Sequence, residues 1–92
     1  MDSTFRMFNS PHEEVELICE NEVMDSIIDR FGEDVVTFTF DQKSFKAVVN
    51  IAVSNVFYSW IFGFGGKVKI NSPAQVKDQY AAMLRSAVQG LD

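Results

Sequence analysis

The chain has 92 residues, of which 47% are hydrophobic and 23% are charged. This composition excludes a largely disordered chain, and no apolar run approaches the roughly 20 residues that span a bilayer. With one histidine and one cysteine, Cys19, the sequence offers no set of metal ligands and no internal disulfide. We therefore expect a soluble, cytoplasmic, single-domain protein that is not an enzyme and holds neither a cofactor nor a metal.

The charge is unevenly distributed along the chain. Residues 1–42 hold 2 Lys or Arg and 11 Asp or Glu, a net of −9, whereas residues 43–92 hold 6 and 2, a net of +4. The charges are scattered and never form a run of five, so we interpret this as two halves that interleave in the fold and neutralise each other. The net charge of −5 also disfavours a general binder of phosphate backbones, which needs clustered Lys and Arg.

The first segments are interpreted from their hydrophobic periodicity. Residues 1–12 have no clean period and contain a Pro break, so we expect a linker or arm there and a domain over residues 13–92. Residues 14–20 alternate as a strand with Cys19 on its apolar face. A helix is predicted to follow, with Asn21 as its N-cap and Gly32 as its stop.

The next segments form a predicted hairpin around the turn at residues 41–43. The strand before this turn covers residues 35–40 and the strand after it covers residues 44–53. In the first strand we expect Val35 and the two threonines to lie on the open face of a sheet, and the other apolar residues to face the core. These expected core residues are Val36, Phe38 and Phe40.

Two further helices and one strand complete the predicted elements. Ser54 caps a helix that ends at the glycine-rich segment 63–66, and a strand covers residues 67–70. Ser72 as N-cap and Pro73 at the first helical position begin a third helix of about 17 residues. Its apolar stripe consists of Val76, Tyr80, Met83, Leu84, Ala87 and Leu91.

The resulting order, β-α-β-β-α-β-α, predicts an α+β fold. Its first six elements match the split β-α-β, or ferredoxin-like, arrangement, an antiparallel sheet of strand order 4-1-3-2 with two helices on one face. This topology places acidic residues of the first strand on the open face, beside lysines of the third and fourth strands. The charges expected on that face are Glu14, Glu16, Glu20, Lys46, Lys67 and Lys69.

Three features of the sequence suggest chemistry, and each has a simpler structural interpretation. The glycine segment 63–66 closes a helix and opens a strand, the reverse of a phosphate-binding loop, so we expect a left-handed glycine to terminate the helix and a tight turn to follow. Cys19 shares the core face of its strand, which favours a buried and inert thiol. The open face of the central strands offers no aromatic residue, so the signal for RNA recognition on the sheet is absent.

The second helix is crowded with aromatic residues. Phe57 and Trp60 fall on its predicted core face, and we expect Trp60 to be largely buried. Helical spacing sends Tyr58 and Phe62 to another side, where exposed aromatics suit a protein interface. Together with the third helix they form the candidate interface, namely Tyr58, Phe62, Val76, Tyr80, Met83, Leu84 and Leu91.

An ordered set of short segments carries a family resemblance. The segments are Ile28-Asp29-Arg30-Phe31-Gly32, Val53-Ser54 with Phe57, Trp60-Ile61-Phe62-Gly63-Phe64-Gly65, and Val68-Lys69-Ile70 with Pro73 and Val76. In this order and spacing the chain resembles, over roughly residues 13–90, the C-terminal extension (WCX) domain of WYL-domain transcriptional regulators of the DeoR-like or YafY-like kind. Within these segments, structural roles are expected for Phe31, Gly32, Phe57, Trp60, Gly63, Gly65 and Pro73.

The resemblance implies a longer parent regulator, of which this chain is a fragment. In that family a winged helix-turn-helix domain binds DNA, the WYL domain is associated with ligand or nucleic-acid sensing, and the extension is associated with dimer contacts and effector response. We therefore expect a homodimer that contacts the WYL domain, binds DNA only through the helix-turn-helix domain and does not contact a membrane. The alternative hypothesis is a small-molecule-binding regulatory domain of the ACT type.

A ferredoxin-like enzyme of the acylphosphatase kind is a third hypothesis, which the sequence disfavours. Such an enzyme needs an anion-binding loop with an arginine after the first strand. Here the segment Cys19-Glu20-Asn21-Glu22 is acidic instead.

Overall fold

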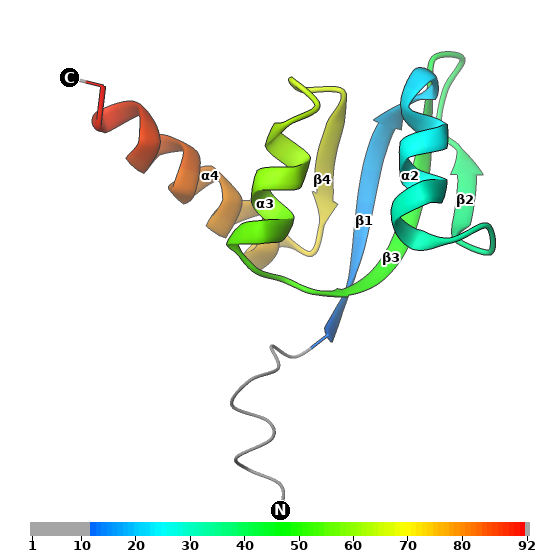
Figure 1. Cartoon of the computed structure of the whole chain (residues 1–92), viewed down its shortest axis with the longest axis horizontal. Coiled ribbons are helices and arrows are strands. Elements are labelled where there is room, and N and C mark those ends of the chain that lie inside the picture. The colour runs from blue at the N-terminus through cyan, green and yellow to red at the C-terminus, as the bar shows by residue number, and fades with distance from the viewer. Residues whose placement is uncertain (1–11, 92) are drawn as a thin grey trace, which may run out of the picture.

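The computed structural model describes residues 12–91 as one sheet with helices on one of its faces (Figure 1). The elements in chain order are β1 (His12–Glu20), the 3-10 turn η1 (Asn21–Val23), α2 (Met24–Phe31), β2 (Val36–Thr39), β3 (Ser44–Ala52), α3 (Asn55–Phe62), β4 (Val68–Ser72) and α4 (Ala74–Gln89). The predicted linker lies outside the described residues except for His12, which opens β1.

The sheet has four strands in the order β2-β3-β1-β4, and every neighbouring pair is antiparallel. The α+β class and the strand order predicted from the sequence are thereby confirmed. β1 and β3 form the centre and pair over their full length, from His12 opposite Ala52 to Glu20 opposite Ser44. Both α2 and α3 lie in front of the sheet in Figure 1, whereas α4 runs away from it past β4.

In the two central strands, buried apolar residues alternate with more exposed residues, and the buried ones form one side of the core. Val15, Leu17 and Cys19 of β1 face the helices and are fully buried. Residues of β3, β4 and the helices complete one apolar cluster between the sheet and the helical layer. The other buried members are Val23, Ile27, Phe45, Ala47, Val49, Phe57, Tyr58, Ile61, Val68, Ile70 and Val76.

The two faces of β2 are the reverse of those predicted. Val36, Phe38 and Phe40 are 52%, 54% and 55% exposed, and Val36 and Phe38 pair with Val48 and Lys46 on the open face of the sheet. The cause is the turn, in which the Phe40 amide donates to the Ser44 carbonyl. Three residues lie between Phe40 and Ser44, so odd-numbered residues of β2 pair with odd-numbered residues of β3. Because the odd-numbered residues of β3 face the core, the even-numbered residues of β2 face the open side of the sheet.

Two helix starts also differ from prediction. The Asn21 side chain does not cap a helix but donates to the Gln42 carbonyl, and the chain enters α2 through η1. Ser72 is not an N-cap because it belongs to β4, and Pro73 occupies the N-cap position of α4. The Ser54 cap of α3 is confirmed, since its hydroxyl accepts from the Phe57 amide at 3.4 Å.

Glycines end the two shorter helices in different ways. Gly32 has φ 99°, a left-handed conformation that a side chain rarely adopts, and its amide donates to the Ile28 carbonyl at 2.7 Å. Gly63 at the end of α3 is right-handed instead, contrary to the prediction, and the positive φ angles occur at Gly65 and Gly66. The glycine segment therefore turns the chain into β4, as its place between a helix and a strand indicated.

The charges of the open face pair in part as expected. Lys46 Nζ lies 3.6 Å from Glu16 Oε1 across the β1–β3 pair. Lys67 bonds instead to Glu22 of η1 at 2.7 Å, which raises the pKa of the lysine through the hydrogen bond and the negative charge. No helix within residues 12–91 is both long and apolar enough to cross a membrane.

Candidate interaction surfaces

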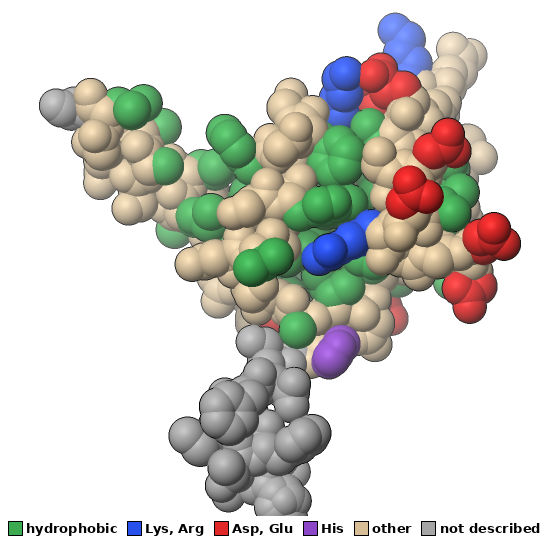
Figure 2. All heavy atoms as spheres, viewed as in Figure 1, with side chains coloured by type: hydrophobic (Ala, Val, Ile, Leu, Met, Phe, Trp, Pro, Cys, Tyr) green, Lys and Arg blue, Asp and Glu red, His purple; other side chains and the backbone are tan. Residues whose placement is uncertain are grey.

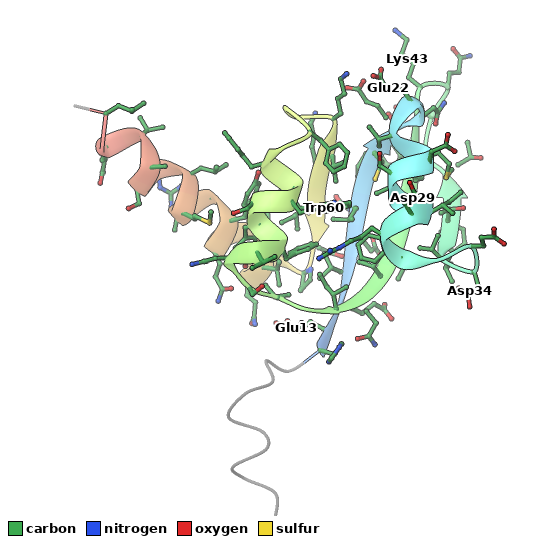
Figure 3. All side chains as sticks on the ribbon, in the orientation of Figure 1. Glu13, Glu22, Asp29, Asp34, Lys43 and Trp60 are labelled. Carbon is green, nitrogen blue, oxygen red and sulfur yellow. The ribbon has the colours of Figure 1, made fainter. Side chains whose placement is uncertain are left out.

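Aromatic rings fill the space between α2 and α3. Trp60 on α3 stands edge-to-face with Phe31 of α2 at 5.5 Å between centroids and with Phe64 at 4.9 Å. The Arg30 guanidinium lies 5.6 Å from the centre of the Trp60 ring (Figure 3). Trp60 is half-buried rather than largely buried as predicted.

Tyr58 was predicted at an interface, and the structure places it in the core. It is 5% exposed, its ring stacks on that of Tyr80 at 5.5 Å, and its hydroxyl donates to Gln79 Oε1 at 3.0 Å. Burial raises the pKa of the Tyr58 hydroxyl. Tyr58 is covered by the first half of α4, through Val76, Gln79 and Tyr80, which the periodicity of one helix cannot predict.

The two halves of α4 have different surroundings. In the first half Val76 is fully buried and Tyr80 packs on Tyr58. Val88 in the second half and Leu91 just beyond the helix are mainly exposed, and Figure 2 shows hydrophobic side chains here, where the chain leaves the body of the protein. The predicted stripe is therefore covered only along its first half.

An apolar hollow of about 550 Å³ lies between α3 and the second half of α4. Its lining includes Phe62, which is 63% exposed, so an apolar surface faces solvent across both helices. We call this the α4 surface; it consists of Ser59, Phe62, Met83, Leu84, Ala87, Val88 and Leu91. Of the predicted interface residues, the structure brings four together here and places Tyr58, Val76 and Tyr80 in or against the core.

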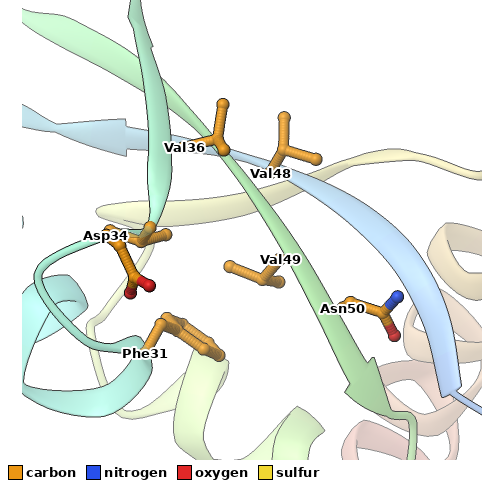
Figure 4. Close-up of a pocket in the computed structure, with 7 residues that line it drawn as sticks. Phe31, Asp34, Val36, Val48, Val49 and Asn50 are labelled. Atoms are coloured by element: carbon orange, nitrogen blue, oxygen red, sulfur yellow. The ribbon is translucent and has the colours of Figure 1, made fainter.

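A second apolar surface lies at the opposite edge of the sheet. We call it the β2 edge; it consists of strand β2 and its exposed residues Val36, Phe38 and Phe40. Where β2 begins, a notch of about 210 Å³ opens between the loop after α2 and β3, with Asp34 and Asn50 at its rim and Phe31 and Val49 at its base (Figure 4). Sequence analysis missed this surface because it assigned the phenylalanines of β2 to the core.

The corrected faces of β2 also change the open face of the sheet. Phe38 lies opposite Lys46, which itself lies opposite Ile18 of β1, so the edge strand β2 adds an aromatic residue to the open face. The central strands β1 and β3 carry no Phe, Tyr or Trp on that face, as predicted. Glu16 pairs with Lys46 and accepts from Asn71, so acidic groups occupy the centre of this face. The arrangement lacks the unpaired cluster of Lys and Arg that a nucleic-acid backbone requires.

The reactive groups of the described part of the chain are not arranged for chemistry. Cys19 is fully buried, and burial raises the pKa of its thiol to about 12, which disfavours the nucleophilic thiolate. No group of three or more potential metal ligands occurs among residues 12–91. Gly65 and Gly66 have φ angles of 63° and 95°, and a Cβ atom added at either would meet nothing within 4 Å, so the turn requires these glycines for their backbone conformation and not for space.

Comparison with known proteins gives one match. The family model described as the WCX domain matches residues 11–88 of the chain. No curated protein and no solved structure matches it. The family match does not support the ACT-type alternative.

Proposed function

Because the chain belongs to the WCX domain family, a family of regulatory domains, we propose that it is a non-enzymatic regulatory module of a DNA-binding transcriptional regulator. In this proposal it couples effector sensing by a WYL domain to DNA binding by a helix-turn-helix domain of the same parent chain. The regulator is of the DeoR-like, WYL-containing kind, acts as a homodimer and works in the cytoplasm. The family match over residues 11–88 is the observation that carries the proposal.

The β-α-β-β-α-β order is, in this proposal, the ferredoxin-like arrangement. The sheet order β2-β3-β1-β4 and the position of α2 and α3 on one face support this assignment. Such a unit closes its own core with two helices, so α4 is an addition to it. An added helix that leaves half of its apolar stripe exposed is suited to contact another domain.

The α4 surface is the proposed contact with the WYL domain of the parent chain. Its apolar hollow of about 550 Å³ can receive side chains from a neighbouring domain, and the second half of α4 carries a single charged residue, Arg85. A domain docked there would move α4 relative to the sheet. Effector binding would then shift the relative placement of the DNA-reading domains by favouring one docked arrangement.

Two measurements test the proposal. The coding sequence upstream of Met1 is expected to encode a winged helix-turn-helix and a WYL domain in the same frame, and a different neighbouring domain would contradict it. Fluorescence anisotropy with duplex DNA at physiological salt is expected to show no sequence-selective binding by the 92-residue chain. Tight selective binding by this chain alone would contradict the role assigned to it.

A pair of variants in the longer regulator tests the coupling itself. Val88→Lys places a charge on the α4 surface, whereas Val56→Lys places one on α3 at a position that is also mainly exposed. We expect the first variant to alter the change in DNA affinity that the effector causes, and the second to leave it unchanged. Equal behaviour of the two variants would exclude the α4 surface as the contact.

A further inference from the structure

The two outer edges of the sheet differ in what covers them. β4 is in contact with α4, and its residues Val68 and Ile70 are buried on the core face of the sheet. β2 pairs with β3 on one side, and on its other side no strand or helix of residues 12–91 pairs with it. The Val35 amide donates to the Gly32 carbonyl, so the backbone groups that a further strand would pair with are those of Thr37 and Thr39.

Apart from its length of four residues, β2 has none of the sequence features by which proteins protect an open strand. The segment 35–40 reads Val-Val-Thr-Phe-Thr-Phe and contains no charge, no proline and no glycine. Its β-branched and aromatic residues are those with the highest preference for strands, and three of them are more than half exposed. Protected edges instead carry lysine, proline or a bulge, so this edge is suited to pairing.

We propose that β2 pairs with β2 of a second copy of this chain, antiparallel and around a two-fold axis perpendicular to the sheet. The pairing joins the two sheets into one and places the helices of both copies on the same face. It rests on the proposed function only for the expectation that the regulator is a homodimer, and it assigns the surface through which that dimer forms.

The register follows from the faces of the strand and from the charges at its ends. The even-numbered residues of β2 face the open side of the sheet. Only registers that set even-numbered residues of one copy opposite even-numbered residues of the other therefore place the open faces of both copies on the same side of the joined sheet. With Phe38 opposite Phe38, Val36 lies opposite Phe40, which gives aromatic and β-branched pairs, and Glu33 comes toward Lys43 of the second copy. With Thr37 opposite Thr37, Glu33 comes toward Asp41 instead. The first register is therefore the one proposed.

The second copy is assigned to the β2 edge because one chain cannot use both apolar surfaces in this way. Two different two-fold interfaces on one chain generate an open polymer, whereas one such interface generates a closed dimer. The edge of an antiparallel strand is complementary to itself through its backbone. Phe40 shares a hollow of about 640 Å³ with Phe62 and Leu84, so the two surfaces meet there. The rest of the α4 surface, Ser59, Met83, Ala87, Val88 and Leu91, does not line that hollow and remains free for a different domain.

Repulsion between acidic side chains of the two copies opposes the pairing. Figure 2 shows acidic side chains gathered over α2 and the loop that leads to β2, where Asp25, Asp29, Glu33 and Asp34 are exposed. A two-fold axis beside β2 brings the two acidic surfaces toward each other. Because salt screens exposed charges, the dimer is expected to be tighter at about 0.15 M than at about 0.01 M ionic strength.

Sedimentation equilibrium of the 92-residue chain and two matched variants tests the proposal. Phe38→Lys and Phe62→Lys make the same change at exposed phenylalanines on the β2 edge and on the α4 surface. Strand pairing over so short an edge predicts a weak dimer, so loading concentrations reach about 500 μM. We expect Phe38→Lys to raise the dimer Kd at least about tenfold and Phe62→Lys to leave it unchanged. Circular dichroism verifies that both variants are folded.

A mixture of Phe38→Lys and Phe38→Glu tests the register. Residue 38 faces its own copy in the proposed pairing, so each variant alone is weakened and an equimolar mixture regains the dimer as a heterodimer. A wild-type chain that is monomeric at about 500 μM overturns the proposal, as does a dimer lost in Phe62→Lys or a mixture that stays monomeric. The DNA titration and the upstream coding sequence test the regulatory role separately, so failure of the pairing is distinguishable from failure of that role.

Discussion

The two edge strands of the sheet have similar side chains and very different surroundings. β4 alternates Val68 and Ile70 with polar residues, and both apolar residues are buried. β2 alternates Val36 and Phe38 with threonines, and both apolar residues are exposed. The difference comes from register: Val68 and Ile70 lie opposite Cys19 and Leu17 on the core face, whereas Val36 and Phe38 lie opposite Val48 and Lys46 on the open face. Alternation thus identifies a strand but does not determine which of its faces is covered.

The strongest test of this comparison sets a core phenylalanine against one at the β2 edge. Phe57→Ala removes a ring that is 2% exposed, and we expect it to lower the free energy of unfolding by about 3–5 kcal/mol. Phe38→Ala should change it by less than about 0.5 kcal/mol in the monomer. Urea unfolding at low micromolar concentration measures both. A loss of more than about 2 kcal/mol in Phe38→Ala would mean that β2 is covered in solution.

Trp60 is expected to give an intermediate effect, because it joins α2 to α3 but is only half-buried. Trp60→Ala should lower the free energy of unfolding by about 2–3 kcal/mol, less than a fully buried tryptophan would give. Trp60→Phe keeps an aromatic ring there and serves as the milder control. A Trp60→Ala variant as stable as the wild type in thermal unfolding would show that the aromatic cluster does not hold the two helices.

A pair of valines compares the covered and the open edge directly. Val76 of α4 is fully buried against the β4 side, so Val76→Ala should cost about 2 kcal/mol for two lost methyl groups and the cavity they leave. Val36→Ala on β2 should cost less than about 0.5 kcal/mol. Equal effects in chemical denaturation would contradict the difference between the two edges.

Tyr58→Phe tests how firmly α4 is held over α3. The variant keeps the ring stacked on Tyr80 and removes the hydroxyl that donates to Gln79. The expected loss is about 1 kcal/mol, the contribution of one partly buried hydrogen bond. Gln79→Ala should give a similar loss, and the double variant should add little to either, which a double-mutant cycle measures.

The smallest expected effect is a pH dependence at Cys19, at the centre of the sheet. Burial raises the pKa of this thiol from 9.0 to about 12, so the folded chain favours the protonated form. The stability that this provides is present below about pH 9 and is lost as the pH rises toward about 12. The difference in unfolding free energy between the wild type and Cys19→Ala should therefore decrease from about pH 8 to about pH 10.5. A constant difference would show that the thiol is accessible.

The sequence by itself determined the elements, the order of the strands and the central core. β1 and β3 alternate so regularly that their buried faces follow from the residue types, and Gly32 ends its helix where the periodicity stops. The resemblance to the WCX domain, which the match over residues 11–88 confirms, likewise required only the order of short segments. These features depend on residues that are close to one another along the chain, so they can be predicted from the sequence.

The tertiary structure decided where the apolar side chains of β2, α3 and α4 lie. The length of the turn before Ser44 sets the register of β2, and that register overrides the preference of Phe38 for the core. The path of α4 buries Tyr58 and leaves Leu91, 85% exposed, in solvent. A hydrophobic pattern records which residues can be buried, whereas the packing of distant elements determines which of them are.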